Sequence, residues 1–304
     1  MLYTVTFNPS LDYLIEVDRL TIGRVNRTLQ EHIYPGGKGV NVSILLQNLG
    51  LSNTALGFCA GFTGRELARL LGEFGCETDF IEIPGCTRIN VKVKNGGMTD
   101  INGQGPQIPP EAQDALLQKL DALRAGDALV LAGSIPNTLP ADVYERILQM
   151  LDGRGVHIVV DATRELLMNV LPYHPFLIKP NHHELGELFG KELHTPEEIA
   201  FYAQALQEHG ARNVLVSMGG KGALLAAEDG QVLRSRAPGG KAVNPVGAGD
   251  SMVAGFLYGY MSTGHYREAL RMGLVCGSAT AMQPWLATKA DIEALSAKFP
   301  DLAD

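Results

Sequence analysis

The chain has 304 residues, of which 45% are hydrophobic, and it carries a formal net charge of −8. That acidic balance argues against a broad nucleic-acid surface, although a local cluster of cations and helix N-termini can still hold an anionic substrate. The longest apolar runs are interrupted by Gly, Asp or Arg, so no membrane span is expected.

The N-terminal segment is strand-like and has neither the charged region nor the cleavage site of a signal peptide. The cysteines are scattered and form no Cys-x-x-Cys pair; they are Cys59, Cys76, Cys86 and Cys276. In a chain of this size without a secretion signal, we expect free thiols in a reducing compartment. The sequence therefore predicts a cytoplasmic protein.

Asp12 closes the sequence Asn-Pro-Ser-Leu-Asp, directly after the first predicted strand. Parallel α/β sheets bind ligands at the carboxyl ends of their strands, so this position favours contact with a substrate. The alternative is a carboxylate in an ordinary turn, because Pro, Ser and Asp all favour turns.

Two segments, 12–35 and 86–104, interrupt the α/β pattern with residues that alternate between apolar and polar. They contain four strand-like runs: Tyr13–Val17, Thr28–Tyr34, Arg88–Lys94 and Thr99–Asn102. These runs predict a small β-sheet that projects as a lid over a cleft, as a dimer surface, or as both. Its apolar side chains exceed what a small sheet can bury internally, so we expect a homodimer through the lid. Arg88 could reach a bound phosphate from the lid, or it could be a solvated edge charge.

A glycine-rich turn, Pro-Gly-Gly-Lys-Gly-Val-Asn, joins the second run to a predicted helix that ends near Leu49. Its glycines, Gly37 among them, let the backbone pass close to a small ligand, while Lys38 and Asn41 offer donors to hydroxyls or phosphate. The turn is not a Walker A loop, and no Gly-x-Gly-x-x-Gly follows a strand. The common P-loop and dinucleotide-binding patterns are therefore excluded.

From residue 128 onward, strand-like and helix-like runs alternate. The predicted strands are Ala128–Leu131, Val156–Val160, Phe176–Ile178, Asn213–Ser217 and Gly222–Ala226, and the predicted helices are Ala141–Leu151, His182–Phe189, Pro196–His209, Ser251–Ser262, Tyr266–Met282 and Lys289–Lys298. This alternation predicts a mainly parallel sheet with helices on both faces. Because no repeat or long linker divides the chain, residues 1–304 are interpreted as a single domain.

Asn181 and Glu184 lie three residues apart at the start of one predicted helix, directly after a strand. Two oxygen ligands on one face of a first turn suit a hydrated Mg²⁺ shared with nucleotide phosphates. The alternative is a capping box, with Asn181 as the N-cap and Glu184 reaching back. Zinc is disfavoured, because His182 and His183 have no His-Glu-x-x-His pattern or cysteine pair to complete a site.

A loop rich in glycine separates two later strands; its residues are Ser217, Met218, Gly219, Gly220, Lys221 and Gly222. It is longer than a tight hairpin requires, so we expect it to pass over the phosphates of a nucleotide. A simple hairpin turn is the alternative.

The most informative motif is Asn-Pro-Val-Gly-Ala-Gly-Asp-Ser at residues 244–251, ahead of a small-residue helix. Gly247, Ala248 and Gly249 leave backbone N–H groups free to face an anion at the helix start. Asp250, beside this anion pocket, is suited to take a proton from an attacking hydroxyl during phosphoryl transfer. The alternative is an ordinary helix cap, in which Asp250 or Ser251 accepts from the first turn.

In this combination and order, the motifs resemble those of the ribokinase-like (PfkB) carbohydrate kinases over essentially the full chain. The glycine-rich turn is similar to that family's first signature, residues 244–251 to its second, and Asn181 with Glu184 to its magnesium-associated motif. The resemblance implies an α/β, ribokinase-like three-layer sandwich with a mainly parallel central sheet and a small projecting β-sheet lid. The catalytic signature shows no departure from the family's pattern, whereas the residues around Gln283–Leu286 are less similar to it.

Within the family, Thr87–Lys92 and Thr99–Gly103 are most similar to the 1-phosphofructokinases, with the tagatose-6-phosphate kinases next. The resemblance implies an ATP- and Mg²⁺-dependent kinase acting on the free primary hydroxyl of a ketohexose phosphate, first of all fructose 1-phosphate. Tagatose 6-phosphate has a similar outline and is the alternative substrate. A non-catalytic sugar- or nucleotide-binding regulator, or a pyridoxal or nucleoside kinase of the same fold, is a more distant alternative.

The resemblance also implies a role for each candidate residue. Asp250 is the implied base, Gly247, Ala248 and Gly249 the anion hole, and Asn181 with Glu184 the Mg²⁺ site. ATP is implied along Ser217–Gly222 toward Gly249. The implied sugar-binding residues are Asp12, Gly37, Lys38 and Asn41, and the implied phosphate clamp is Arg88, joined by Arg24, Arg27 or Lys38.

Overall fold

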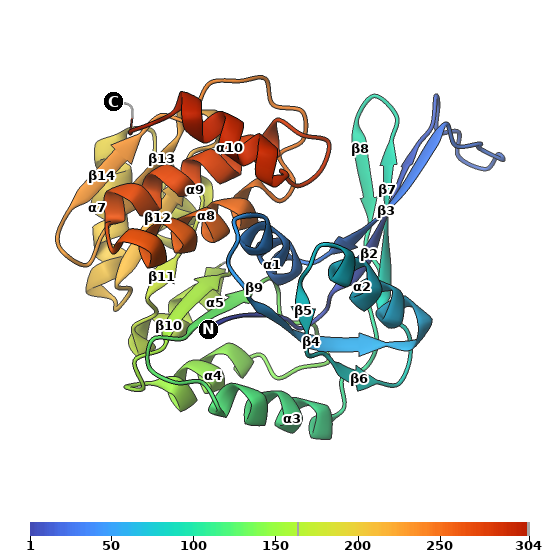
Figure 1. The fold of residues 1–304 in the computed structure, drawn as a ribbon, viewed down its shortest axis with the longest axis horizontal. Helices are drawn as coiled ribbons and strands as arrows, with labels where there is room; N and C mark the ends of the chain where they lie inside the picture. The colour runs from blue at the N-terminus through green and yellow to red at the C-terminus, as the bar shows by residue number, and fades with distance from the viewer. Residues whose placement is uncertain (163, 303–304) are drawn as a thin grey trace.

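The computed structural model describes residues 1–162 and 164–302, whose strands form a large and a small sheet (Figure 1). The large sheet has the order β14-β13-β12-β11-β10-β9-β1-β4-β5, with β6 beside β4. Its strands are β1 (Leu2–Thr6), β4 (Thr54–Ala60), β5 (Glu77–Thr78), β6 (Ile81–Ile83), β9 (Ala128–Ala132), β10 (His157–Asp161), β11 (Leu177–Ile178), β12 (Asn213–Ser217), β13 (Ala223–Ala226) and β14 (Val232–Ser235). All neighbours run parallel except β12–β13 and β13–β14, so the mainly parallel sheet is confirmed.

Helices cover both faces of the large sheet, because its central strands are apolar on both sides. In β9, Leu129 and Leu131 pack into one core and Val130 into the other. The first core is covered by α3 (Pro110–Asp121), α4 (Val143–Leu151), α5 (Arg164–Val170), α6 (His182–Leu188) and α7 (Pro196–Glu208). The second is covered by α1 (Lys38–Asn48), α2 (Gly61–Glu73), α8 (Ala248–Thr263), α9 (Tyr266–Ala281) and α10 (Lys289–Lys298). The predicted three-layer sandwich is therefore confirmed; two short 3₁₀ turns, η1 (Leu171–Tyr173) and η2 (Gly219–Lys221), complete it.

The small sheet contains both segments that interrupted the α/β pattern, and it projects from one end of the large one (Figure 1). Its strands are β2 (Ser10–Glu16), β3 (Gln30–Gly36), β7 (Arg88–Lys94) and β8 (Met98–Ile101), in the order β3-β2-β7-β8. The central pair β2–β7 is parallel, and the two outer pairs are antiparallel. Each predicted run therefore forms a strand.

The two faces of the small sheet differ in polarity. On one face Asp12 and Asn90 are opposite each other, and Arg88 lies on the same face two residues before Asn90. The other face leaves large apolar side chains in solvent, with Ile33 52% and Ile101 61% exposed. Because side chains alternate along a strand, this register separates a polar face from an apolar one.

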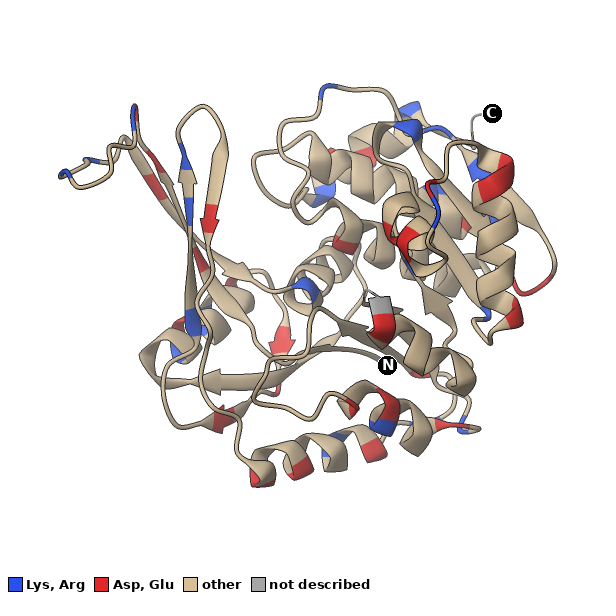
Figure 2. Ribbon diagram, turned by 180° about the vertical axis from the view of Figure 1, so that it is seen from behind, with Lys and Arg blue, Asp and Glu red and all other residues tan. Residues whose placement is uncertain are grey.

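No helix in the described ranges is long and apolar enough to cross a membrane. All four cysteines are free thiols, as predicted. In the ribbon of Figure 2, Lys and Arg positions are interspersed with those of Asp and Glu along the described chain. Binding of an anion would therefore depend on local groups of cations.

Candidate active site

A cleft of about 510 Å³ opens at the carboxyl ends of the parallel strands, beside the base of the small sheet. Thr6 at the end of β1, Asp161 at the end of β10 and Ser217 at the end of β12 all line it. The predicted site residues on its wall are Gly37, Lys38, Asn41, Arg88, Asn181, Glu184, Ser217, Gly247, Gly249 and Asp250. Motifs as far apart in sequence as Asn41 and Asp250, which are separated by 209 residues, thus meet where this sheet class binds its ligands.

Helix α8 begins at Ala248, three residues before the predicted start. Its N-cap is Gly247, whose φ of 80° is a left-handed conformation that glycine adopts without strain. No side chain caps the helix, so the interpretation of Asp250 or Ser251 as an ordinary cap is wrong. The Ser251 hydroxyl instead donates back to the carbonyl of Gly247 at 2.8 Å.

The amides at this helix start are not equivalent. The N–H of Ala248 donates to the carbonyl of Pro245 at 3.2 Å, so it is engaged within the turn. Within the described chain, the N–H groups of Gly249 and Asp250 have no backbone acceptor outside the helix, and both residues line the cleft. These two amides, rather than that of Ala248, are the donors available to an anion at the helix N-terminus.

Asp250 is 6% exposed, and its Oδ2 accepts a hydrogen bond from Asn41 Nδ2 at 2.8 Å. Burial raises the pKa of this carboxyl to about 6, and the nearby Asp161 adds to the increase. Asn41, Lys38 and Lys179 act in the opposite direction. The carboxyl is therefore mainly ionised at pH 7, with a proton affinity close to the one a general base requires.

Asp161 holds two lysines in the cleft. Its Oδ2 lies 3.1 Å from Lys38 Nζ and its Oδ1 lies 3.5 Å from Lys179 Nζ. Burial tends to raise the pKa of Asp161, but the two lysines outweigh burial and lower it. Burial tends to lower the pKa of Lys38, but the charges of Asp161 and Asp250 outweigh it and raise it. Asp161 and Lys38 are therefore both charged at neutral pH.

Lys179 lies beside the start of α8, since a Cβ built on Gly249 would be 3.2 Å from Lys179 Nζ. A cation at this position adds to the field of the helix N-terminus and favours an incoming phosphoryl group. Lys179 and Asp161 are not among the predicted site residues, although each occupies or directly follows a strand end. The strand-end rule that selected Asp12 applies equally to both.

Arg88 lies on the cleft wall, and its Nε donates to the carbonyl of Asn8 at 3.0 Å. This bond fixes the guanidinium while its two terminal nitrogens stay available for a bidentate contact. Asp12 does not line the cleft: it accepts from Ser10 at 2.7 Å and from Asn90 at 2.9 Å at the base of the small sheet. Asp12 therefore orders the residues next to Arg88.

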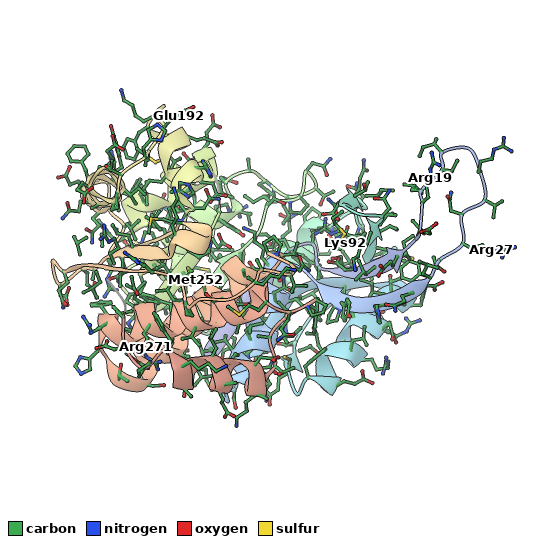
Figure 3. The ribbon with its side chains drawn as sticks, turned by 90° about the horizontal axis from the view of Figure 1, so that it is seen from above. Arg19, Arg27, Lys92, Glu192, Met252 and Arg271 are labelled. Atoms are coloured by element: carbon green, nitrogen blue, oxygen red, sulfur yellow. The ribbon has the colours of Figure 1, made fainter. Side chains whose placement is uncertain are left out.

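Arg24 and Arg27 are not brought into the cleft. Both lie exposed in the loop between β2 and β3. Figure 3 shows Arg27 at the far tip of that loop, away from the main body of the chain. Of the cations predicted for the phosphate clamp, Arg88 and Lys38 line the cleft of the described chain.

A second cavity, of about 430 Å³, lies on the other side of the α8 start. It shares Asn181, Ser217 and Gly249 with the cleft. The rest of its wall is mostly apolar. It comes from α8, α9 and the chain on either side of them, together with His182 and His183 of α6 and part of the glycine loop, and includes Ala237, Pro238, Ala248, Met252, Leu274 and Met282. A mostly apolar slot that opens beside a helix N-terminus suits a planar base carrying phosphates. We refer to it as the apolar slot.

The glycine loop borders this slot only in part. Gly219 and Gly220 line it, whereas Met218 and Lys221 line a separate small hollow. Gly222 has a φ of 101°, and a Cβ there would lie 1.9 Å from the carbonyl oxygen of Ser235. The close packing of β14 therefore requires glycine at position 222, independently of any ligand.

Asn181 and Glu184 form a capping box, as the alternative interpretation expected. The Asn181 side chain accepts from the amides of His183 and Glu184, and Glu184 Oε2 accepts from the Asn181 amide at 2.8 Å. Both side chains also line the cleft. No group of three or more His, Cys, Asp or Glu side chains in the described residues could hold a metal by itself. This donor set fits a cation that keeps most of its water and shares phosphate oxygens, as Mg²⁺ does.

Comparison with known proteins agrees with this geometry. Residues 5–291 match the family model of the pfkB family carbohydrate kinases. The chain is 48% identical to a 1-phosphofructokinase of Bacillus subtilis over 97% of both chains, and 38% identical to a D-tagatose-1-phosphate kinase of Bacillus licheniformis over 94% of both. The structure of phosphofructokinase-2 from Escherichia coli in complex with fructose-6-phosphate has a TM-score of 0.91 at 28% identity, covering 98% of this chain and 99% of that one. The chain therefore belongs to the pfkB family of carbohydrate kinases.

Proposed function

We propose that this kinase transfers the γ-phosphoryl group of ATP to the free primary hydroxyl of fructose 1-phosphate, giving fructose 1,6-bisphosphate. The observation that carries the proposal is Asp250, a buried carboxylate with a pKa raised to about 6 at a glycine-lined helix start. Arg88 lies in the same cleft and supplies a cation for a phosphate already on the sugar. The relative with 48% identity, a 1-phosphofructokinase, supports this choice of sugar.

Asp250 takes the proton from the C6 hydroxyl as that oxygen attacks. General bases of this kind contribute about 10²- to 10⁴-fold in rate. The amides of Gly249 and Asp250 face the moving phosphoryl group, and Lys179 adds a positive charge beside them. These groups are fixed before the reaction, so they stabilise developing charge without reorganising.

The nucleotide occupies the apolar slot with its base, and its phosphates run past Ser217 and Gly219 toward Gly249. Ala248 lines the slot. Its amide is already bonded to the carbonyl of Pro245, so it is not available to the phosphates. Asn181 and Glu184 would hold Mg²⁺ through water. When bound, Mg²⁺ neutralises charge on the phosphate oxygens.

The sugar lies between the glycine-rich turn and the base of the small sheet. Gly37, Lys38 and Asn41 offer contacts to its ring and hydroxyls, and Arg88 holds the phosphate on C1. Asp12 fixes Asn90 behind Arg88 and so belongs to the support of this end of the cleft.

D-tagatose 1-phosphate is the second candidate substrate, favoured by the relative named for that activity. It differs from fructose 1-phosphate only in the configuration at C4, so one hydroxyl contact decides between them. Such a contact is worth about 1–3 kcal/mol when its buried partner would otherwise be unpaired. Tagatose 6-phosphate, the alternative expected from the sequence, is the third candidate.

ADP release by the purified protein tests these candidates directly. The panel consists of fructose 1-phosphate, tagatose 1-phosphate, tagatose 6-phosphate, fructose 6-phosphate and unphosphorylated fructose. We expect the highest kcat/KM with fructose 1-phosphate. We expect a value lower by about 30-fold or more with fructose, because the charge-assisted contact to Arg88 is lost. ADP release with none of the sugar phosphates would contradict the proposal and favour a binding-only regulator.

We also propose that residues 1–304 act as one cytoplasmic kinase domain that pairs into a homodimer through the apolar face of the small sheet. Large exposed apolar side chains gather on this face and in the loop between β2 and β3: Ile22, Val25, Ile33, Ile89 and Ile101. Apolar surface of this kind in a monomer is usually covered by a partner. A two-fold pairing would place the same face of each chain in contact.

A further inference from the structure

Trp285 is the one tryptophan in the chain, and it lies in the segment that departs from the family pattern. Its indole stacks on the ring of Tyr34, with the centroids 4.6 Å apart and the planes inclined by 13°. Phe74, which directly follows α2, also contacts the indole, with the ring centroids 5.2 Å apart and the planes inclined by 45°. Tyr34 belongs to β3 and is opposite Asp12 in the small sheet. Trp285 therefore contacts the strand that leads directly into the glycine-rich turn.

The residues on either side of Trp285 contact the loop before α8. The carbonyl of Pro284 accepts from Asn244 Nδ2 at 2.9 Å. Leu286 packs on the N-cap of α8, since a Cβ built on Gly247 would lie 2.7 Å from Leu286 Cδ2. One tripeptide thus contacts the small sheet through its middle residue and the phosphoryl-binding helix start through its outer two.

A buried chain of hydrogen bonds fixes this tripeptide to α8. The amide of Ala287 donates to Thr280 Oγ1 at 3.1 Å, and the Thr280 and Ser251 hydroxyls are 2.7 Å apart. Ser251 Oγ then donates to the carbonyl of Gly247 at 2.8 Å. Both hydroxyl residues are fully buried, so each of these bonds is costly to break. The segment that carries Trp285 is therefore linked to the helix start through buried hydrogen bonds.

We propose that Trp285 is a positioning residue that couples the small sheet to the start of α8, so that sugar phosphate and nucleotide each strengthen the binding of the other. The inference rests on the proposed function for the location of the two substrates. When the small sheet becomes ordered over a sugar phosphate, it fixes the position of Tyr34, and Tyr34 in turn orients Trp285. Through Pro284 and Leu286, Trp285 then orients the loop that faces the nucleotide phosphates. Coupling between two sites is reciprocal, so nucleotide also orders the sheet.

Binding measurements test the coupling. The dissociation constant of fructose 1-phosphate is measured by calorimetry with and without a non-hydrolysable ATP analogue and Mg²⁺. In the wild type we expect the analogue to lower this constant by at least about three-fold, because stacked aromatic pairs are worth about a 2- to 12-fold change in an equilibrium constant. In Trp285→Ala and in Tyr34→Ala we expect the ratio to fall to about one. The double variant should lose nothing further, because both changes break the same contact.

Two controls separate coupling from a general loss of stability. Trp285→Phe keeps an aromatic ring on Tyr34 and should retain the wild-type ratio. Phe201→Ala removes a ring that is 65% exposed on α7 and lines neither the cleft nor the apolar slot, so it should also retain the ratio. In the wild type, fructose 1-phosphate alone should change the emission of Trp285, since no other tryptophan contributes.

The possible outcomes are distinct. A ratio unchanged in Trp285→Ala, even with a lowered melting temperature, would show that the stack serves packing alone. Absence of coupling in the wild type would overturn the inference equally. If the wild type neither binds nor phosphorylates fructose 1-phosphate, the proposed function fails and the inference fails with it. If it phosphorylates the sugar without coupling, only the inference fails.

Discussion

Asp250 is the residue on which the proposed chemistry depends. It lines the cleft and lies in the first turn of α8, at the helix start that would hold the phosphoryl group. Asp250→Asn keeps the shape and the contact with Asn41 but cannot accept a proton. We expect kcat to fall by at least ~10²-fold while both KM values stay within a few-fold. Steady-state kinetics check this. Turnover near the wild-type rate would leave the carboxylate without a chemical role.

The raised pKa of Asp250 predicts a pH dependence. The base must be ionised, so kcat/KM should rise with pH through about pH 6 and then level off. A profile that is flat between pH 5 and 8 in a three-buffer series would contradict this assignment. The same profile in Asp250→Asn should lose the rise.

The shift in pKa also affects stability. The folded state binds the Asp250 proton more tightly than the unfolded state, in which the carboxyl has its ordinary pKa of 3.8. The stability that this group contributes is therefore present below about pH 4 and is lost as the pH rises through about 6. At pH 7.5, Asp250→Asn should unfold at a higher temperature than the wild type, by the equivalent of about 2–3 kcal/mol. A lower melting temperature would show that the ionised carboxylate stabilises the fold.

Arg88 is expected to contact the sugar phosphate and not ATP. Arg88→Ala should raise KM for the sugar phosphate by about 30- to 150-fold, corresponding to a lost charge-assisted contact of roughly 2–3 kcal/mol, and leave KM for ATP within two-fold. Lys94→Ala is the matched control, because Lys94 lies on the same strand, is 54% exposed and pairs with Glu16. Equal KM values in wild type and Arg88→Ala would place the phosphate clamp elsewhere.

At the scale of elements, two glycines of the loop between β12 and β13 are expected to have different roles, one in packing and one in binding. Gly222→Ala would force a Cβ against the carbonyl of Ser235 at a left-handed φ, which costs about 1–3 kcal/mol from the backbone alone. Gly220→Ala meets nothing within 4 Å and has room for a methyl group. We expect thermal unfolding to show a clear loss of stability for Gly222→Ala only. Because Gly220 lines the slot proposed for the nucleotide, we expect Gly220→Ala to raise KM for ATP instead. Reversed effects would mean that position 222 is the one shaped by nucleotide.

Elements with a clear hydrophobic period could be predicted from sequence to within about two residues. The strand Ala128–Leu131 and the helix Tyr266–Met282 are examples. The start of α8 could not, because Gly247 begins the helix from a left-handed conformation that no periodicity signals. The parallel pairing of β2 with β7 also lay beyond the sequence, since it joins residues nearly eighty positions apart.

The candidate site divides in the same way. Motifs that are continuous in sequence, such as residues 244–251 and the glycine-rich turn, could be recognised because their functional residues are adjacent in the chain. Asp161 and Lys179 could have been selected by their places at strand ends, but the contact between them is created only by the order of the strands in the sheet. The apolar slot was also missed, since residues from four separate segments of the chain build it.

At the scale of the whole molecule, the exposed apolar face of the small sheet predicts a dimer. Light scattering at micromolar concentration should give twice the chain mass of 32.7 kDa. Ile33→Glu, which places a charge on that face, should shift the mass toward the monomer and raise KM for the sugar phosphate, because the small sheet carries Arg88. A wild-type species of 32.7 kDa would rule out a stable dimer.

The central claim is that one cleft moves a phosphoryl group from ATP to the C6 oxygen of fructose 1-phosphate. Phosphorus NMR of the purified protein with ATP, Mg²⁺ and fructose 1-phosphate tests it most directly, because the spectrum identifies both the donor and the position phosphorylated. We expect the γ-phosphate signal to decay while ADP and a second phosphomonoester on C6 appear in equal amounts. Release of inorganic phosphate without a bisphosphate, or a spectrum that stays unchanged, would contradict the account.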